Sequence, residues 1–363
     1  MSQPKWTREQ KQAIDVRKGT VLLAAAAGSG KTAVLVQRVI DILSDPSDPV
    51  EPKQLLVVTF TRAAAEQMQE RISQRFQELL AADPTNHYLR KQMALLSTAR
   101  ISTVHSFCMN LIRANFHLLG IQPDVRLGDE GDMKLLTAEL AEDCIEAFYE
   151  KDALNSSEDF AQVVKLFSNR GDDRDLPGLL LKIYHFLRSR PYYNQWMDDA
   201  LAAYGYEGAI EESLWGRLIL EESRRSLEEV KEELSHSDDA IWAEELLGLL
   251  NEGRWDPIFH YVQSHPAKER KTETAKKLAK QLGESLFCCS EAAFRRDLRH
   301  LYPRISTLFE LVRDLDRRLV EEKQRRHILD FADLEHLCIQ LLVQPGEDGS
   351  YGKTQLAEEL SKE

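Results

Sequence analysis

A run of small residues that ends in a lysine and a threonine is the part of this sequence with the clearest chemistry. It lies between a short apolar stretch and an amphipathic one, and it consists of Ala25, Ala26, Ala27, Gly28, Ser29, Gly30, Lys31 and Thr32. Backbone N–H groups of such a turn point at phosphate oxygens, and the following helix adds the positive end of its dipole. In this pattern the lysine reaches the β- and γ-phosphates and the threonine hydroxyl ligates Mg²⁺. The segment predicts a nucleoside triphosphate site with ATP and Mg²⁺ as expected ligands, although Ala25 stands where the strict pattern has glycine.

Polar and aromatic side chains at three other places extend this hypothesis. Gln10 lies ahead of the loop, and a glutamine amide can pair with both the N6 donor and the N7 acceptor of adenine. Two later apolar runs end in further candidates, which are Phe60, Thr61 and Arg62 after the first run and Thr103 and His105 after the second. Ligands of open α/β sheets bind where parallel strands end, and an exposed ring there can stack on a base. Taken singly, Thr103 and His105 can also cap a helix, and Phe60 can be a core residue.

Alternating strand and helix patterns must position these side chains. Short runs rich in Val and Leu predict buried parallel strands at 20–24, 55–59 and 100–104. Apolar residues at helical spacing predict helices at 32–43, 63–80 and 105–119. This order predicts an α/β domain with a parallel sheet.

The chain changes character after about residue 120. Residues 129–326 have almost only helical periodicity with acidic faces, which predicts an all-helical insertion. Prolines predict breaks in it, near Pro177, Pro191, Pro257 and Pro303. A long amphipathic helix is expected at 304–326, and Asp330 is expected to cap the helix after it. Residues 343–352 are rich in Pro and Gly and predict a loop.

Composition and charge narrow the class of protein. No apolar stretch approaches the ~18 residues that a membrane span needs, and the N-terminus lacks a secretion signal, so no membrane partner and a cytoplasmic location are expected. The five cysteines form no CxxC pair, so no structural metal is expected. The net charge of −13 divides unevenly, because residues 1–120 carry +5 and the remainder carries −18. Phosphate chemistry is therefore expected in the first part.

Four segments together resemble, in sequence and in order, the Q motif and motifs I, Ia and Ib of superfamily 1A DNA helicases, the UvrD/Rep/PcrA group. They read WTREQKQAI from Trp6, AAAAGSGKTAVL from Ala24, TFTRAAAEQM from Thr59 and STVHSFC from Ser102. The alanine-rich loop, the opening Trp-Thr and the acidic helical stretch resemble more particularly the AddA-type helicase–nuclease subunits of bacteria. Residues 329–337 resemble the family's return into the motor core.

The resemblance implies a RecA-like P-loop domain (1A) at 1–120 and 328–363, interrupted by a helical insertion (1B) at 121–327. It implies that Gln10 reads adenine and that Lys31 and Thr32 are catalytic. It further implies that the residues after the two later apolar runs line a track for single-stranded DNA, namely Phe60, Thr61, Arg62, Thr103 and His105. It also implies ATP-dependent 3′–5′ helicase action with exonuclease activity in the whole protein. The substrates would be duplex and single-stranded DNA ends in double-strand break repair by recombination, handled in the bacterial cytoplasm beside an AddB-like subunit.

One part of such a motor is not found in the sequence. An ATPase of this class needs an apolar strand that ends in Asp-Glu, for Mg²⁺ and for water activation. Asp129 and Glu130 follow a stretch too short and polar for a buried strand. We therefore expect an N-terminal fragment truncated before that segment, which binds ATP weakly and hydrolyses it near background. Two other classes fit the residues alone, a P-loop NTPase without a DNA role, such as a kinase or regulatory switch, and a helical protein-interaction module.

Overall fold

The chain divides into two compact units. A computed structural model describes residues 6–362 apart from 27, 156–157, 168–172 and 347–349. Unit 1 comprises Met1–Asp129 and Lys323–Glu363, and unit 2 comprises Glu130–Glu322. None of the described helices is long and apolar enough to cross a membrane.

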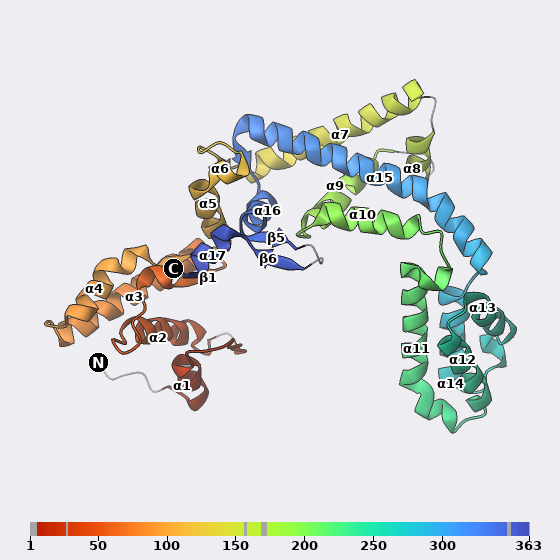
Figure 1. Ribbon diagram of the computed structural model, residues 1–363, viewed down its shortest axis with the longest axis horizontal. Helices are drawn as coiled ribbons and strands as arrows, with labels where there is room; N and C mark the ends of the chain where they lie inside the picture. Colours follow the sequence, from red (N-terminus) through yellow and green to blue (C-terminus); the bar gives the residue numbers. More distant parts are fainter. Residues whose placement is uncertain (1–5, 27, 156–157, 168–172, 347–349, 363) are drawn as a thin grey trace. The chain divides into compact units, whose positions relative to one another are not determined.

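Unit 1 alternates helices with short strands (Figure 1). Its helices are α1 (Arg8–Asp15), α2 (Lys31–Leu43), α3 (Arg62–Ala82), α4 (His87–Leu95), α5 (Val104–Ala114), α6 (Phe116–Leu119), α16 (Phe331–Leu342) and α17 (Gln355–Lys362). Its strands are β1 (Leu56–Thr59), β2 (Arg100–Thr103), β3 (Arg126–Leu127), β4 (Ile328–Leu329), β5 (Val343–Pro345) and β6 (Tyr351–Lys353). The expected alternation is therefore confirmed from β1 to α5.

The described strands of unit 1 form three two-stranded sheets. β1 and β2 are parallel, with Val57 opposite Ile101, so the predicted pairing of these two strands is confirmed. β3 and β4 are also parallel. The predicted loop at 343–352 is wrong in its described part, because β5 and β6 form an antiparallel hairpin. Its Pro345 ends a strand and its Gly346 N–H bonds to the Ser350 carbonyl, so these residues turn the chain without interrupting the ladder.

The predicted strand at 20–24 is wrong. Residues 20–26 have no regular secondary structure, and Leu22 is 93% exposed. A buried strand needs neighbouring strands to pair its backbone N–H and C=O groups. Among the described residues, no strand pairs with this segment. The apolar run indicates a tendency to be buried, but it does not supply the pairing partner.

Two larger apolar clusters pack the described part of unit 1. One lies between α2, α3, β1 and β2 and includes Leu43, Ile72 and Phe76. The other joins α5 to α16, which lie side by side (Figure 1), through Ile112 and Leu334. The second cluster brings the end of the chain against the strand–helix part that contains the motifs.

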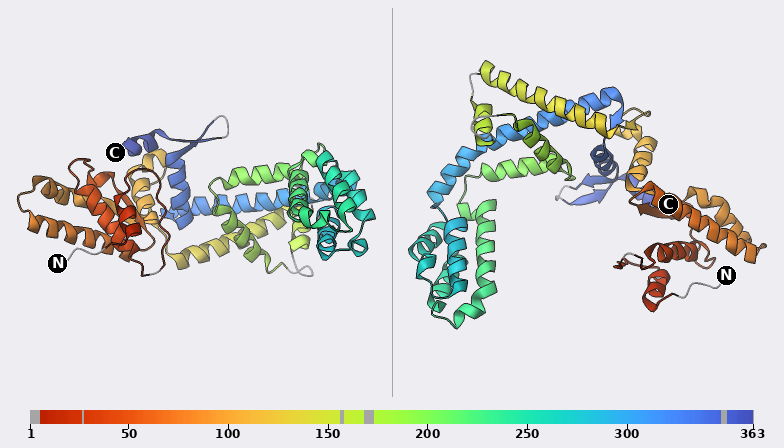
Figure 2. Two further views of the ribbon diagram at one scale, coloured as in Figure 1. Left: turned by 90° about the horizontal axis from the view of Figure 1, so that it is seen from below. Right: turned by 180° about the vertical axis from the view of Figure 1, so that it is seen from behind.

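In unit 2, the described residues form helices and no strands, as the periodicity predicts. These helices are α7 (Glu130–Asn155), α8 (Asp159–Phe167), α9 (Leu176–Arg188), α10 (Tyr193–Tyr204), α11 (Leu214–Ser235), α12 (Ala240–Glu252), α13 (Trp255–Ser264), α14 (Glu273–Gln281) and α15 (Glu291–Arg326), the last of which continues into unit 1. Helices α11 to α14 gather around one core that includes Trp255 and Leu278, and both views of Figure 2 show them as one bundle.

The expected break at Pro303 is wrong, because α15 begins at Glu291 and runs through this proline. A proline inside a helix costs about 3 kcal/mol, since it removes one hydrogen bond and crowds the preceding turn. Leu298 precedes Pro303, Leu308 and Leu311 follow it, and all three are buried. Each buried leucine contributes roughly 1.5–3 kcal/mol, so packing on both sides of the proline offsets its cost.

Candidate nucleotide and nucleic-acid sites

The small-residue loop ends in a tight turn from which α2 begins. Gly28 and Gly30 have φ angles of 78° and 83°, in the left-handed region that favours glycine. Within the turn, the Ser29 N–H donates to the Ala26 carbonyl at 3.3 Å, whereas Ala27 lies outside the described residues. Gly30 is the N-cap of α2 and offers no side-chain cap to its first turn. The start of α2 therefore suits an anion, which would take the place of the missing cap.

Lys31 and Thr32 are the first two residues of α2 and both are exposed. The Lys31 ammonium donates to the carbonyl of Ala25 and, at 3.2 Å, to the carbonyl of Ala26, so it lies on the loop. A glycine turn, an uncapped helix start, an ammonium and a hydroxyl form a donor set that fits a triphosphate with Mg²⁺.

Gln10 lies beside this loop, as the motif order predicts. Its amide nitrogen donates to the Ser29 carbonyl at 3.1 Å, and its amide oxygen accepts from the Thr7 N–H at 2.9 Å in the capping box of α1. Ala13 and Ile14 of α1 are buried with Val34 of α2, which fixes the two helices together. Gln10 therefore contacts the glycine turn, while its role in adenine recognition stays a prediction.

A second site lies where β1 and β2 end. A pocket of about 510 Å³ is lined by four of the five predicted DNA contacts, Phe60, Arg62, Thr103 and His105. Phe60 is fully exposed, which excludes the alternative that it is a core residue. An exposed ring next to an arginine provides a stacking face and a phosphate contact at one place.

The threonines near this pocket have structural roles. Thr61 is the N-cap of α3, and its hydroxyl accepts from the Ala64 N–H at 3.2 Å. Thr103 is the N-cap of α5, accepts from the Ser106 N–H at 3.1 Å and is 9% exposed. The alternative that Thr103 caps a helix is therefore confirmed. These threonines fix the starts of the helices that carry Arg62 and His105.

Further residues line this pocket, and the sequence did not indicate Asn110, Arg113 or Phe331 among them. Phe331 is 48% exposed, and its ring centroid lies 4.7 Å from that of His105. His105 also lies 3.5 Å from a carboxylate oxygen of Glu335. The sequence contained one related indication, the resemblance of residues 329–337 to the family's return into the motor core. Such a resemblance does not show which side chains are in contact.

A cluster of charges holds Phe331 at its place. The ammonium of Lys323 lies 2.6 Å from Asp330 and 2.8 Å from Asp333, and Lys323 is 3% exposed. Asp330 and Asp333 also form the capping box of α16, so the predicted N-cap at Asp330 is confirmed. We call Lys323, Asp330 and Asp333 the clamp. A separate hydrogen bond, between His327 and Asp124, keeps the pKa of the Asp124 carboxyl below its usual range.

Comparison with known proteins identifies the family of the chain. A family model described as "UvrD/REP helicase N-terminal domain" matches residues 6–363. Among curated relatives, a protein from Acetivibrio thermocellus, named as the A subunit of an ATP-dependent helicase/nuclease, is 34% identical over 95% of this chain and 30% of its own length. Proteins of the same name from Ruminiclostridium cellulolyticum and Clostridium perfringens are each 33% identical, over 99% and 98% of this chain and 32% and 31% of their own lengths. The chain thus spans about a third of the length of these relatives.

Proposed function

We propose that this chain, which belongs to the UvrD/REP helicase family, is the N-terminal, ATP-binding portion of one subunit of an ATP-dependent 3′–5′ DNA helicase/nuclease. The whole protein would act on duplex and single-stranded DNA ends in double-strand break repair by recombination. It would work in the bacterial cytoplasm beside a second, AddB-like subunit, since its relatives are named as one subunit of a helicase/nuclease. Unit 1 would be part of a RecA-like domain and unit 2 its helical insertion.

One observation carries this proposal: unit 1 contains both a phosphate-binding loop in contact with Gln10 and a pocket that gathers Phe60, Arg62 and His105. A kinase or regulatory switch would explain the loop, but it gives no reason for an exposed phenylalanine and an arginine at the ends of adjacent strands. A helical interaction module would explain neither site. A helicase accounts for both.

The residues divide the work between nucleotide and DNA. ATP supplies the free energy for movement when it is bound. Lys31 and Thr32 would hold its phosphates and Mg²⁺, and Gln10 would give up its contact with Ser29 to read adenine. Phe60 and Arg62 would hold a base and a phosphate of single-stranded DNA, while Thr61 and Thr103 position them through the helix caps.

The nucleotide site is tested by binding of a fluorescent ATP analogue with Mg²⁺. Lys31→Ala should abolish binding while the melting temperature stays unchanged, because Lys31 is exposed. Lys11→Ala, an exposed lysine of α1, is the matched control and should bind normally. Equal binding by Lys31→Ala and the control would exclude the loop as a triphosphate site.

The DNA site is tested by fluorescence anisotropy of a labelled single-stranded oligonucleotide. Loss of one stacking contact costs about 1–3 kcal/mol, so Phe60→Ala should weaken binding between about fivefold and a hundredfold. Leu118→Ala is the control, since Leu118 is an exposed apolar residue of unit 1 that does not line the pocket. Tight ATP-analogue binding without salt-dependent oligonucleotide binding would favour an NTPase with no DNA role.

A further inference from the structure

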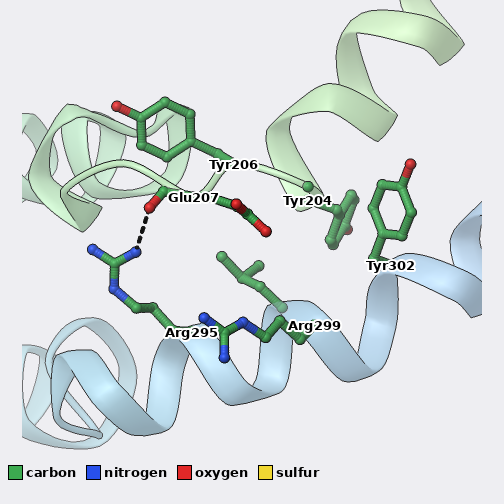
Figure 3. A pocket seen from close by; sticks show the side chains of 8 residues that line it. Tyr204, Tyr206, Glu207, Arg295, Arg299 and Tyr302 are labelled. Carbon is green, nitrogen blue, oxygen red and sulfur yellow. Dashed lines mark hydrogen bonds between the residues drawn. The ribbon is translucent and has the colours of Figure 1, made fainter.

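Unit 2 contains a pocket that none of the helicase-like motifs reaches. It has a volume of about 320 Å³ and lies between the segment at the end of α10 and the N-terminal part of α15 (Figure 3). The last residue of α10 and the loop after it contribute residues 204–207, and α15 contributes Arg295, Leu298, Arg299 and Tyr302. A pocket of this size suits a small ligand or one unit of a polymer.

Two tyrosine rings form one end of this pocket. Tyr204 and Tyr302 both line it and are labelled in Figure 3. Tyr204 is held by Trp215, with ring centroids 5.2 Å apart. The ring of Tyr302 lies on the backbone of Gly205, where an added Cβ would come within 2.8 Å of a ring carbon. Tyr302 nevertheless remains 40% exposed, so part of a fixed aromatic surface is accessible.

Two arginines border the pocket, and they differ in how they are bound. Arg295 is held by the Glu291 carboxylate at 2.9 Å and donates to the Glu207 carbonyl at 3.1 Å. Arg299, one turn later, makes no hydrogen bond or ion pair within the described part of the chain. Figure 3 shows the Glu207 carboxylate directed toward α15 and the Arg299 guanidinium lying along the helix, and both residues line the pocket. A cation and an acceptor are therefore both available to a ligand.

We propose that this pocket binds one unpaired nucleotide of single-stranded DNA, with a base that carries an exocyclic amino group. The base stacks at Tyr302, its amino group donates to Glu207, and Arg299 binds the adjacent phosphate. Unit 2 has 26 Lys and Arg against 40 Asp and Glu, so its net negative charge repels a polyanion over most of its surface. DNA therefore binds unit 2 at the guanidinium of Arg299, which makes no ion pair within the described part of the chain. Thymine has no exocyclic amine, so cytosine is preferred over thymine.

The test uses the full 363-residue chain with Phe60→Ala, so that binding at unit 1 is reduced and the two DNA sites are distinguished. Fluorescein-labelled (dC)₁₀ should bind about fivefold or more tightly than (dT)₁₀, and Glu207→Ala should remove this preference. Tyr302→Ala should weaken binding of both oligonucleotides at least about fivefold. Arg299→Ala should reduce the slope of log K against log salt by about 0.7.

Arg296→Ala is the matched control, because Arg296 is exposed on the same helix and does not line the pocket. Its salt slope should equal that of the parent chain. An oligonucleotide with one 5-iododeoxycytidine, irradiated and mapped by mass spectrometry, should crosslink to Tyr204 or Tyr302. Crosslinks confined to the pocket at Phe60, or equal effects of Arg299→Ala and Arg296→Ala, would overturn the assignment while leaving the DNA site of unit 1 intact.

Discussion

Replacing Lys323 by methionine should destabilise the start of α16 more than any exposed charge change in unit 1. Lys323 is 3% exposed, and its ammonium lies between the carboxylates of Asp330 and Asp333. Methionine fills a similar volume without the charge. The variant therefore leaves two carboxylates close together, with Asp333 only 7% exposed and no lysine to neutralise it.

Removal of one partner from a buried ion pair costs about 3–5 kcal/mol, mainly because the remaining charge is desolvated and unpaired. Hydrogen exchange of the α16 amides measures this opening free energy directly. A loss of that size accelerates exchange between about a hundredfold and several thousandfold. The Lys323→Met, Asp330→Asn, Asp333→Asn variant should recover most of the protection, because asparagine still caps a helix and the two carboxylate charges are removed together with the lysine charge.

The control is Lys91→Met, which breaks a lysine–carboxylate pair of 3.1 Å to Glu51 at side chains that are 62% and 41% exposed. Exposed pairs contribute about 0–1 kcal/mol, so exchange in α4 should rise less than about fivefold. If Lys323→Met behaves like this control, or if the triple variant is no better protected, the clamp does not hold α16. Because Phe331 is the first residue of α16, loosening should also weaken oligonucleotide binding at the unit 1 pocket.

Three further changes test other parts of the structure. Gly30→Ala should destabilise the loop by about 1–2 kcal/mol, because φ is 83° at this position, and should therefore lower the affinity for an ATP analogue. Gly178→Ala is the control and should leave this affinity unchanged, because no neighbour lies within 4 Å of the added carbon. Phe331→Ala should weaken oligonucleotide binding about as much as Phe60→Ala, and Phe331→Tyr should retain it; full affinity in Phe331→Ala would exclude a contact with DNA. Burial opposes ionisation of Asp239, but hydrogen bonds from the Thr272 and Lys271 amides lower its pKa overall. An ionised carboxylate with a lowered pKa stabilises the folded state at pH values above its pKa in the unfolded chain, about 3.9, and this stabilisation is lost as the pH falls through the pKa of the folded state. In urea titrations, the loss of unfolding free energy caused by Asp239→Asn should therefore become smaller below about pH 4.

The parts of unit 1 that follow from the sequence are those in which local chemistry and periodicity agree. Thr103, for which a helix cap is one of the two roles that the sequence allows, does start a helix after a short strand, and a hydroxyl cap acts within three residues of its own position. Gly28 and Gly30 predict a turn because only glycine adopts positive φ at no cost. In each case the determining contact is local in the sequence.

The errors arise where distant contacts decide. Leu22 belongs to an apolar run that is typical of a strand, yet pairing depends on a neighbour that local pattern cannot specify. Pro303 should end a helix by its own propensity, but leucines that pack on both sides of it keep α15 continuous. Phe331 enters the pocket only because α16 packs on α5, two helices separated in the sequence by the whole of unit 2.

The unit 1 pocket is built at the two places where the chain leaves unit 1 and returns to it. Leu127 lines the pocket shortly before the chain enters unit 2, and Phe331 lines it shortly after the return. The pairing of Leu127 with Leu329 joins these two passages, and the clamp then fixes α16. All these contacts lie within unit 1, and Lys323 is carried there by the end of α15, which begins in unit 2. The candidate DNA contacts at Phe60, His105 and Phe331 are therefore brought together by contacts at the points where the chain leaves unit 1 and returns to it.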